Sequence, residues 1–177
     1  MKFSGVAALV YLSWTVSGFN FPYEAIQLTE AHVENLPAIA FGDTKAEAVS
    51  KSPTCKAYPG TPEWPLEEDW NQLNKTLDGA LLKPSPAASA CYNGTNYDSK
   101  QCTYLVQGAR GSRFYINDPL TVLTQWPQGE TCTVSAKPTG NCTQGGFPVY
   151  VVNVTTVQQV QAAVNFARNK NIRLVIK

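Results

Sequence analysis

Charge is scarce in this chain: charged residues make up 15% of its 177 residues, and the formal net charge at pH 7 is +1. The basic residues are scattered, so the clustered positive surface of proteins that bind nucleic acid is not predicted. Histidine occurs once, at His32, and no C-x-x-C pair is present. Because a zinc site needs several such ligands, we expect no metal site and interpret His32 as an ordinary surface residue.

Long apolar runs are also missing, with one short exception at the amino terminus. Lys2 precedes the run VAALVYLSWTV, and small residues follow near Gly18. This order is typical of a secretory signal peptide, and the run is too short to cross a bilayer, which needs about 20 apolar residues. A buried amino-terminal helix is the alternative. We therefore expect residues 1–18 to be a cleaved leader, the protein to be secreted and extracellular, and no membrane to be a partner.

Sequons for N-glycosylation are numerous for so short a chain. Their acceptors are Asn74, Asn93, Asn141 and Asn153. A single sequon arises often by chance, but four behind a signal peptide suit an exported glycoprotein.

All the cysteines follow the leader, in the part of the chain that would meet an oxidising environment. Their number is odd, and sequence alone leaves many pairings open. Proximity favours the bridges Cys91–Cys102 and Cys132–Cys142, each of which closes a small loop. Cys55 is then left without a partner in this sequence.

Two stretches show no sustained periodicity. Residues 19–54 are broken by three prolines and a glycine, so we expect a loosely attached amino-terminal arm. Residues 55–146 form a disulfide-bridged region that is mostly irregular after residue 82. Its aromatic residues either pack around the bridged loops or form a stacking platform for sugars or bases; they are Tyr92, Tyr97, Tyr104, Phe114, Tyr115 and Trp126.

One helix is predicted within residues 62–82. Pro65 suits its first position, and the acidic run 67–69 suits its first turn, where the helix dipole favours negative charge. Gly79 can end it in a left-handed conformation. Its apolar face is formed by Leu66, Trp70, Leu73 and Leu77. The carboxylates could instead be a catalytic pair, but no base or metal ligand lies nearby in sequence, which favours a capped helix start.

Residues 147–177 have the clearest pattern. FPVYVVNV is typical of a strand buried on both faces, and IRLVIK of a second strand. Between them, Thr155 and Gln158 predict a capping box that opens a helix over about 156–169. The buried side of this helix is expected to carry Val157, Val160, Val164 and Ala167, and the polar side Gln158, Gln161, Asn165 and Arg168.

Strand, helix and strand make a βαβ unit, whose two strands should be parallel with a right-handed crossover. The predicted class is therefore α+β: an irregular, disulfide-containing amino-terminal region followed by one βαβ unit. In open α/β folds, ligands lie beyond the carboxyl ends of the strands, in the loops that follow them. A ligand loop would begin at Lys177.

The stretch GGFPVYVVNVTTVQQVQAAVNFARNKNIRLVIK resembles the opening of the FAD-binding domain of the vanillyl-alcohol oxidase and berberine-bridge-enzyme superfamily, the PCMH-type flavin fold. Upstream, CKAYPGTPEWPLEEDWNQLNKTLDGALL and ACYNGTNYDSKQC resemble secreted fungal members, including isoamyl alcohol oxidase-like proteins. The resemblance covers residues 55–177. It implies that residues 147–177 start an incomplete PCMH-type domain, with 149–154 and 172–176 as its first two strands.

In that family the second strand leads into a Gly-His-Asp loop, whose backbone holds the FAD pyrophosphate and whose His often bonds covalently to the flavin. The resemblance therefore implies FAD as the cofactor and Lys177 as a candidate contact, with a solvated terminal charge as an equal alternative. The rest of the flavin domain, the substrate domain and the catalytic base would lie outside this sequence. Some members carry Cys where this chain has Ala57 and Glu63, so a partner for Cys55 is either absent or outside it.

Two functions are compatible with these features. The first is the amino-terminal part of a secreted FAD-dependent oxidoreductase, which oxidises an alcohol or similar small-molecule substrate while oxygen reoxidises the flavin. This fragment would itself be inactive, contribute no catalytic residue and bind FAD weakly. The second is a secreted, glycosylated binding or effector module without catalysis. Bridged loops and aromatic residues favour the module, whereas a βαβ unit with an uncovered apolar sheet favours the enzyme.

Overall fold

The computed structural model describes residues 21–42, 55–108, 111–120 and 129–177, and the expected leader lies outside them. The elements in these ranges are η1 (Pro22–Ala25), α1 (Glu30–Asn35), η2 (Pro37–Ile39), α2 (Glu67–Thr76), β1 (Leu81–Leu82), η4 (Ala87–Cys91), α3 (Ser99–Gly108), α4 (Ser112–Asn117), β2 (Val151–Val152) and α5 (Val157–Asn169). Helices occur with a two-stranded sheet and two disulfides. These features confirm the α+β class and the disulfide-containing region, but not the βαβ unit. None of the helices in the described ranges is long and apolar enough to cross a membrane.

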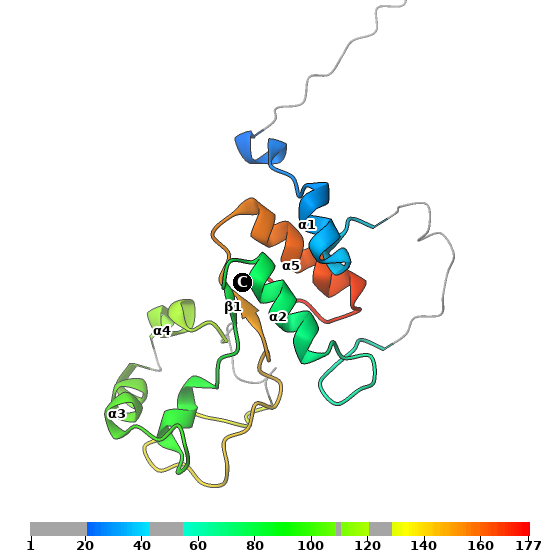
Figure 1. Cartoon of the computed structure of the whole chain (residues 1–177). Coiled ribbons are helices and arrows are strands. Elements are labelled where there is room, and N and C mark those ends of the chain that lie inside the picture. The colour runs from blue at the N-terminus through cyan, green and yellow to red at the C-terminus, as the bar shows by residue number, and fades with distance from the viewer. Residues whose placement is uncertain (1–20, 43–54, 109–110, 121–128) are drawn as a thin grey trace, which may run out of the picture.

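Helices α1, α2 and α5 gather in one part of the molecule, which we call the helical region and define as residues 21–42, 55–82 and 148–177 (Figure 1). Its core contains the buried side chains of Leu36, Ile39, Trp70, Leu73, Leu77, Ala162 and Phe166. The Trp70 ring lies with its centroid 4.0 Å from that of Tyr150 and 5.2 Å from that of Phe166. The core therefore joins segments that are far apart in the chain.

Helix α2 begins later than its sequence suggested. Leu66 is its N-cap, and the Leu66 main-chain N–H donates to Asp69 Oδ2 at 3.0 Å. Pro65 therefore lies before the cap rather than at the first helical position, and Leu66, expected on the buried face, is 73% exposed. Both predictions were wrong because the Asp69 carboxylate reaches back to cap the helix at Leu66.

The remainder of α2 follows the prediction. Trp70, Leu73 and Leu77 are buried at helical spacing. Gly79 has a φ of +82°, and its N–H donates to the Asn74 carbonyl at 2.9 Å. The helix therefore ends in a left-handed turn, as predicted, but the turn begins one residue earlier: Asp78 has a φ of +54°, and its N–H donates to the Lys75 carbonyl at 3.2 Å.

Helix α5 occupies Val157–Asn169, within a residue of the predicted start, but its capping box is shifted. Thr156 Oγ1 accepts from Gln159 N at 3.2 Å, and Gln159 Oε1 accepts from Thr156 N at 3.3 Å. The predicted Thr155–Gln158 pair was wrong because the sequence TTVQQ satisfies the capping pattern in two registers.

The buried face of α5 also differs from the predicted one. Val160 and Val164 are 44% and 37% exposed, whereas Ala162 and Phe166 are buried. Asn165, expected on the polar side, is buried too, and its Nδ2 donates to the carbonyl of Ile39 at 3.0 Å. Apolar periodicity missed this face because a buried amide is stable where it bonds a main-chain carbonyl of another segment.

The expected parallel pairing of 147–154 with 171–177 does not occur, although both segments are described. Strand β2 instead pairs antiparallel with β1, with Val152 opposite Leu81. In the last segment, Ile172 makes a single parallel bridge to Ala57. The sequence pattern indicated extended backbone on either side of α5, but the choice of partner depends on residues 57 and 81–82, which are remote in the chain.

The amino-terminal arm is packed rather than loose over residues 21–42, while residues 43–54 lie outside the described part. Ile39 is fully buried, and Leu36 is 3% exposed. Side chains of α5 bind the carbonyls around η2: Asn169 Nδ2 donates to Ala38 O at 2.8 Å. The arm therefore supplies part of the core.

The rest of the described chain, residues 83–108, 111–120 and 129–147, forms the bridged region, which contains α3 and α4 and lies apart from the helices of the helical region (Figure 1). The structure joins Cys91 to Cys102 and Cys132 to Cys142, the pairs that proximity favoured. Both bridges belong to one small cluster, in which Tyr92 is buried. Cys55 is a free, exposed thiol.

Candidate functional site

The family resemblance directs attention to Lys177. This residue is exposed, and its ammonium group donates to the main-chain carbonyl of Asp118 in the bridged region. The residues before it are exposed as well, with Leu174 at 46% and Ile176 at 79%. The structure thus places the Lys177 charge at the surface, where the two regions meet.

An open cleft of about 460 Å³ lies next to Asp118, between α3 and α4. Tyr104, Leu105, Arg113 and Asp118 are among its lining residues. Arg113 and Asp118 thus line the same cleft, and the ammonium group of Lys177 donates to the Asp118 carbonyl. Sequence reasoning singled out neither Arg113 nor Asp118, because both lie in a stretch without periodicity.

The start of α5 is a candidate anion-binding site, because helix N-termini present free N–H groups. Here Gln159 Oε1 accepts from the N–H groups of Thr155 and Thr156, at 2.8 and 3.3 Å. The N–H of Gln159 itself donates to Thr156 Oγ1. The protein's own side chains therefore already bind the N–H groups of Thr155, Thr156 and Gln159.

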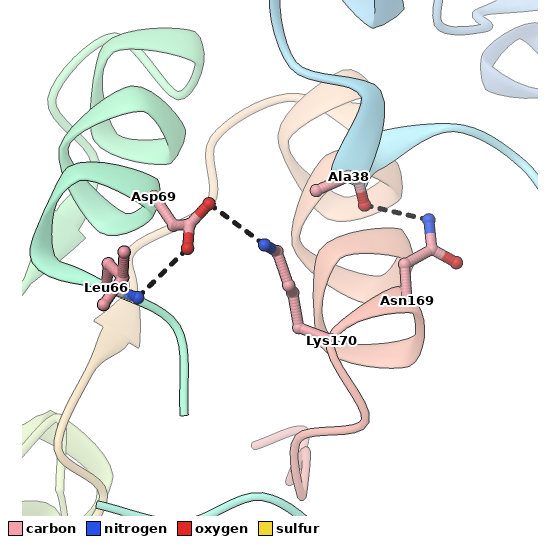
Figure 2. A network of polar contacts seen from close by, with 5 residues as sticks. All are labelled: Ala38, Leu66, Asp69, Asn169 and Lys170. Atoms are coloured by element: carbon pink, nitrogen blue, oxygen red, sulfur yellow. Dashed lines mark hydrogen bonds and ion pairs between the residues drawn. The ribbon is translucent and has the colours of Figure 1, made fainter. Parts of the chain in front are cut away.

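The acidic run of α2 has a structural role at Asp69 (Figure 2). Asp69 Oδ2 accepts from the Leu66 N–H, and Asp69 Oδ1 lies 3.0 Å from Lys170 Nζ. Figure 2 shows Lys170 reaching from the end of α5 toward α2, while the neighbouring Asn169 points away to the carbonyl of Ala38. This arrangement supports the capped-helix interpretation over a catalytic pair.

A second open cleft, of about 590 Å³, lies beside the Cys91–Cys102 bridge. Its lining includes Tyr92, Tyr97, Asn93 and Asn141. Tyr92 packs in the bridged cluster, and its hydroxyl donates to Thr133 O at 3.2 Å.

The other aromatic residues of this stretch divide into exposed and undescribed ones. Tyr97 and Tyr104 are 54% and 63% exposed, so packing accounts for Tyr92 but not for them. The side chains of Phe114, Tyr115 and Trp126 lie outside the described part.

The four expected glycosylation acceptors differ in environment. Asn93, Asn141 and Asn153 are exposed. Asn74 is half-buried in α2, and its Oδ1 accepts from the Leu81 N–H at 3.1 Å. Among the described residues, no cluster of three or more metal-ligating side chains is found, and exposed His32 lies near Thr29, with 2.7 Å between His32 Nδ1 and Thr29 Oγ1.

No protein-family model matches the chain, whereas individual proteins do. It is 41% identical over 129 residues to the VAO-type flavoprotein oxidase VAO615 of Thermothelomyces thermophilus, covering 71% of this chain and 22% of that protein. It is 31% identical over 144 residues to the FAD-linked oxidoreductase orf1 of Neocamarosporium betae, covering 79% and 24%. The crystal structure of the VAO-type flavoprotein MtVAO615 from Myceliophthora thermophila is similar with a TM-score of 0.64 and 40% identity, covering 70% of this chain and 23% of that one.

The chain thus spans less than a quarter of the length of each of these relatives. The comparison of sequences and the comparison of structures agree, because both find a VAO-type flavoprotein. On this basis, the chain belongs to the superfamily of VAO-type, FAD-linked flavoproteins.

Proposed function

We propose that this chain is the amino-terminal part of a secreted FAD-dependent oxidoreductase that oxidises an alcohol or a similar small molecule, with oxygen reoxidising the flavin. The similarity to a VAO-type flavoprotein oxidase, at 41% identity over 129 residues, is the observation that carries this proposal. In such an enzyme the cofactor supplies the redox chemistry, and the protein binds and orients it.

We expect the described residues alone to bind FAD weakly. A dinucleotide needs backbone N–H groups for its pyrophosphate, and those of Thr155, Thr156 and Gln159 at the start of α5 are bound by neighbouring side chains. Neither of the two clefts described in the bridged region is an enclosed cavity. We therefore assign no redox step to residues of this chain, and Lys177 remains a proposed contact at the edge of a cofactor site.

The role of this part is then architectural. The core around Trp70 and Phe166 holds α5 against α2, and α5 in turn positions the segment 171–177. In the family that this chain resembles, the cofactor loop follows that segment. We propose that this part supports the loop without contributing a catalytic residue.

Expression of the 177-residue chain in a secreting fungal host tests the proposal. We expect a colourless protein, without stoichiometric flavin absorbance near about 450 nm even after addition of FAD. The matched comparison is the product of the reading frame extended past codon 177, which should be yellow and contain a Gly-His-Asp loop. A stoichiometric yellow protein from the 177 residues would contradict the proposed division of roles.

The non-catalytic module is distinguished by the same pair of expressions. A stop codon after residue 177, together with a stable and monodisperse secreted protein, would favour a binding or effector module. The open cleft that Tyr97 and Asn93 line is the observation in favour of that alternative.

A further inference from the structure

The sequon at Asn141 differs from the other three in its middle residue. In Asn141-Cys142-Thr143 the middle residue is a cysteine, and Cys142 is bridged to Cys132. The corresponding residues of the other sequons are Lys75, Gly94 and Val154, none of which can form a covalent cross-link of this kind. The acceptor segment at Asn141 is therefore tied covalently when the bridge is closed.

The folded structure fixes the same sequon at its third residue. The Thr143 N–H donates to the carbonyl of Thr131 at 3.1 Å, and Thr131 Oγ1 donates to the carbonyl of Thr143 at 3.1 Å. Cys132, next to Thr131, is only 3% exposed. Both main-chain groups of Thr143 are thus held against the segment that carries the bridge.

Transfer of an oligosaccharide requires the Asn amide and the hydroxyl two residues later to be presented together to an enzyme. Asn141 is exposed and is one of the residues that line a cleft, so the folded protein has room for an attached glycan. The bridge and the two hydrogen bonds of Thr143 nevertheless hold the main chain of the sequon against the segment around Cys132, although Asn141 and Thr143 are both exposed.

We propose that Asn141 is glycosylated only on chains in which the Cys132–Cys142 bridge has not yet closed, so that oxidation and glycosylation compete for this segment. The inference rests on the proposed secretion of the chain, because both reactions belong to the secretory pathway. Under this proposal, the glycan occupancy of Asn141 reports the fraction of chains that were glycosylated before the bridge closed.

Each competing reaction is complete in its atoms and electrons. In glycosylation, Asn141 Nδ2 forms a bond to the anomeric carbon of a lipid-linked oligosaccharide diphosphate. The bond from that carbon to the diphosphate breaks, and the displaced amide proton is taken up by a base. In oxidation, the thiols of Cys132 and Cys142 lose two protons and two electrons to an oxidised protein disulfide, which becomes a dithiol.

Timing favours the bridge as the competitor at this site. Cys132 and Cys142 are separated by 10 positions, so the loop can close as soon as both have emerged, without any other folding. The sequon at Asn153 is held in the folded state by its N–H bond to the carbonyl of Ala80, which requires residues far apart to meet. Asn153 therefore stays available for longer and serves as an internal reference.

The test is site-by-site glycan occupancy of the full 177-residue chain secreted from a fungal host. Occupancy is measured by mass spectrometry after enzymatic deglycosylation in heavy-oxygen water. The variant Cys132→Ser removes the bridge and leaves the Asn141 sequon intact. We expect partial occupancy at Asn141 in the parent chain and an increase of at least about twofold in the variant, because local loop closure no longer competes.

Cys91→Ser is the matched control, since it opens the other bridge and leaves the same number of free thiols. It should leave occupancy at Asn141 unchanged, and Asn153 should be unchanged in both variants. Cell-associated chains are measured along with secreted ones, so a variant that fails to fold still reports its occupancy. A brief dithiothreitol treatment of cells making the parent chain should raise Asn141 occupancy in the same way.

Equal occupancy of Asn141 in the parent and in Cys132→Ser, with Asn153 glycosylated, would overturn this inference alone. Complete occupancy of Asn141 in the parent would also overturn it. Absence of glycan from every sequon would overturn the proposed secretion and, with it, this inference.

Discussion

The helical region and the bridged region are stabilised in different ways. The helical region buries Leu73, Leu77 and Phe166 in a core drawn from three distant segments, and its described residues contain no disulfide. The bridged region has a smaller cluster, built largely from its own cystines and Tyr92. A short segment with few large apolar residues therefore relies on covalent loops, whereas the helices rely on packing.

The largest expected effect is on the packed core. Phe166→Ala should lower the free energy of unfolding of the helical region by about 3–5 kcal/mol, because it removes a buried aromatic side chain and leaves a cavity. Trp70 belongs to this core and Trp64 packs against it, so tryptophan fluorescence during denaturant unfolding measures the change. Val160→Ala on the same helix, at a 44% exposed position, is the control and should cost far less.

Opening one bridge should affect the other region instead. Replacement of both Cys91 and Cys102 by Ser should destabilise the bridged region by about 3 kcal/mol, as expected for a loop of this length. Hydrogen exchange should then increase in residues 86–107 and stay unchanged in α2 and α5. Equal increases of hydrogen exchange in both regions would show that they unfold as one unit, and would contradict the claim that they are stabilised separately.

A smaller effect is expected from the amide that joins the arm to α5. Asn165→Ala leaves the buried carbonyl of Ile39 without its 3.0 Å donor and should cost about 1–3 kcal/mol. The matched control is Asn169→Ala, whose bonds to Ala38 and Ala40 are exposed. Similar losses in the two variants would mean that burial of the carbonyl does not matter here.

The smallest effect is expected at the ion pair of Figure 2. Lys170→Met removes the 3.0 Å contact with Asp69, in which both side chains are partly exposed. We expect a loss of less than about 1 kcal/mol, which should shrink further at high salt. A loss that is large and insensitive to salt would contradict the surface character of this pair.

Local sequence signals predicted local features well. The left-handed end of α2, the burial of its Trp70, Leu73 and Leu77, and the two short-range bridges were all predictable, because each depends on residues close together in the chain. The position of α5 was also predictable, although the sequence TTVQQ left its capping register ambiguous.

Features that depend on remote partners were not predictable. Asn165 is buried because it meets Ile39, 126 residues earlier, and Gln159 because it donates to the carbonyl of Leu77, 82 residues earlier. The pairing of β2 with β1 likewise depends on residues 81–82. No periodicity within α5 or β2 could report these contacts. The same holds for Lys177, the candidate cofactor contact, whose ammonium group donates to the carbonyl of Asp118, 59 residues earlier.

The burial of Leu36 and Ile39 sets a practical limit on how this protein can be produced. A recombinant version that starts after residue 42, as the irregular sequence of the arm would suggest, would lack Leu36 and Ile39, which pack in one core with Ala162 and Phe166, and would expose part of that core to water. Such a truncation would create an exposed apolar surface that favours self-association. Production should therefore start upstream of Leu28, whose N–H already donates to Gln161 on α5.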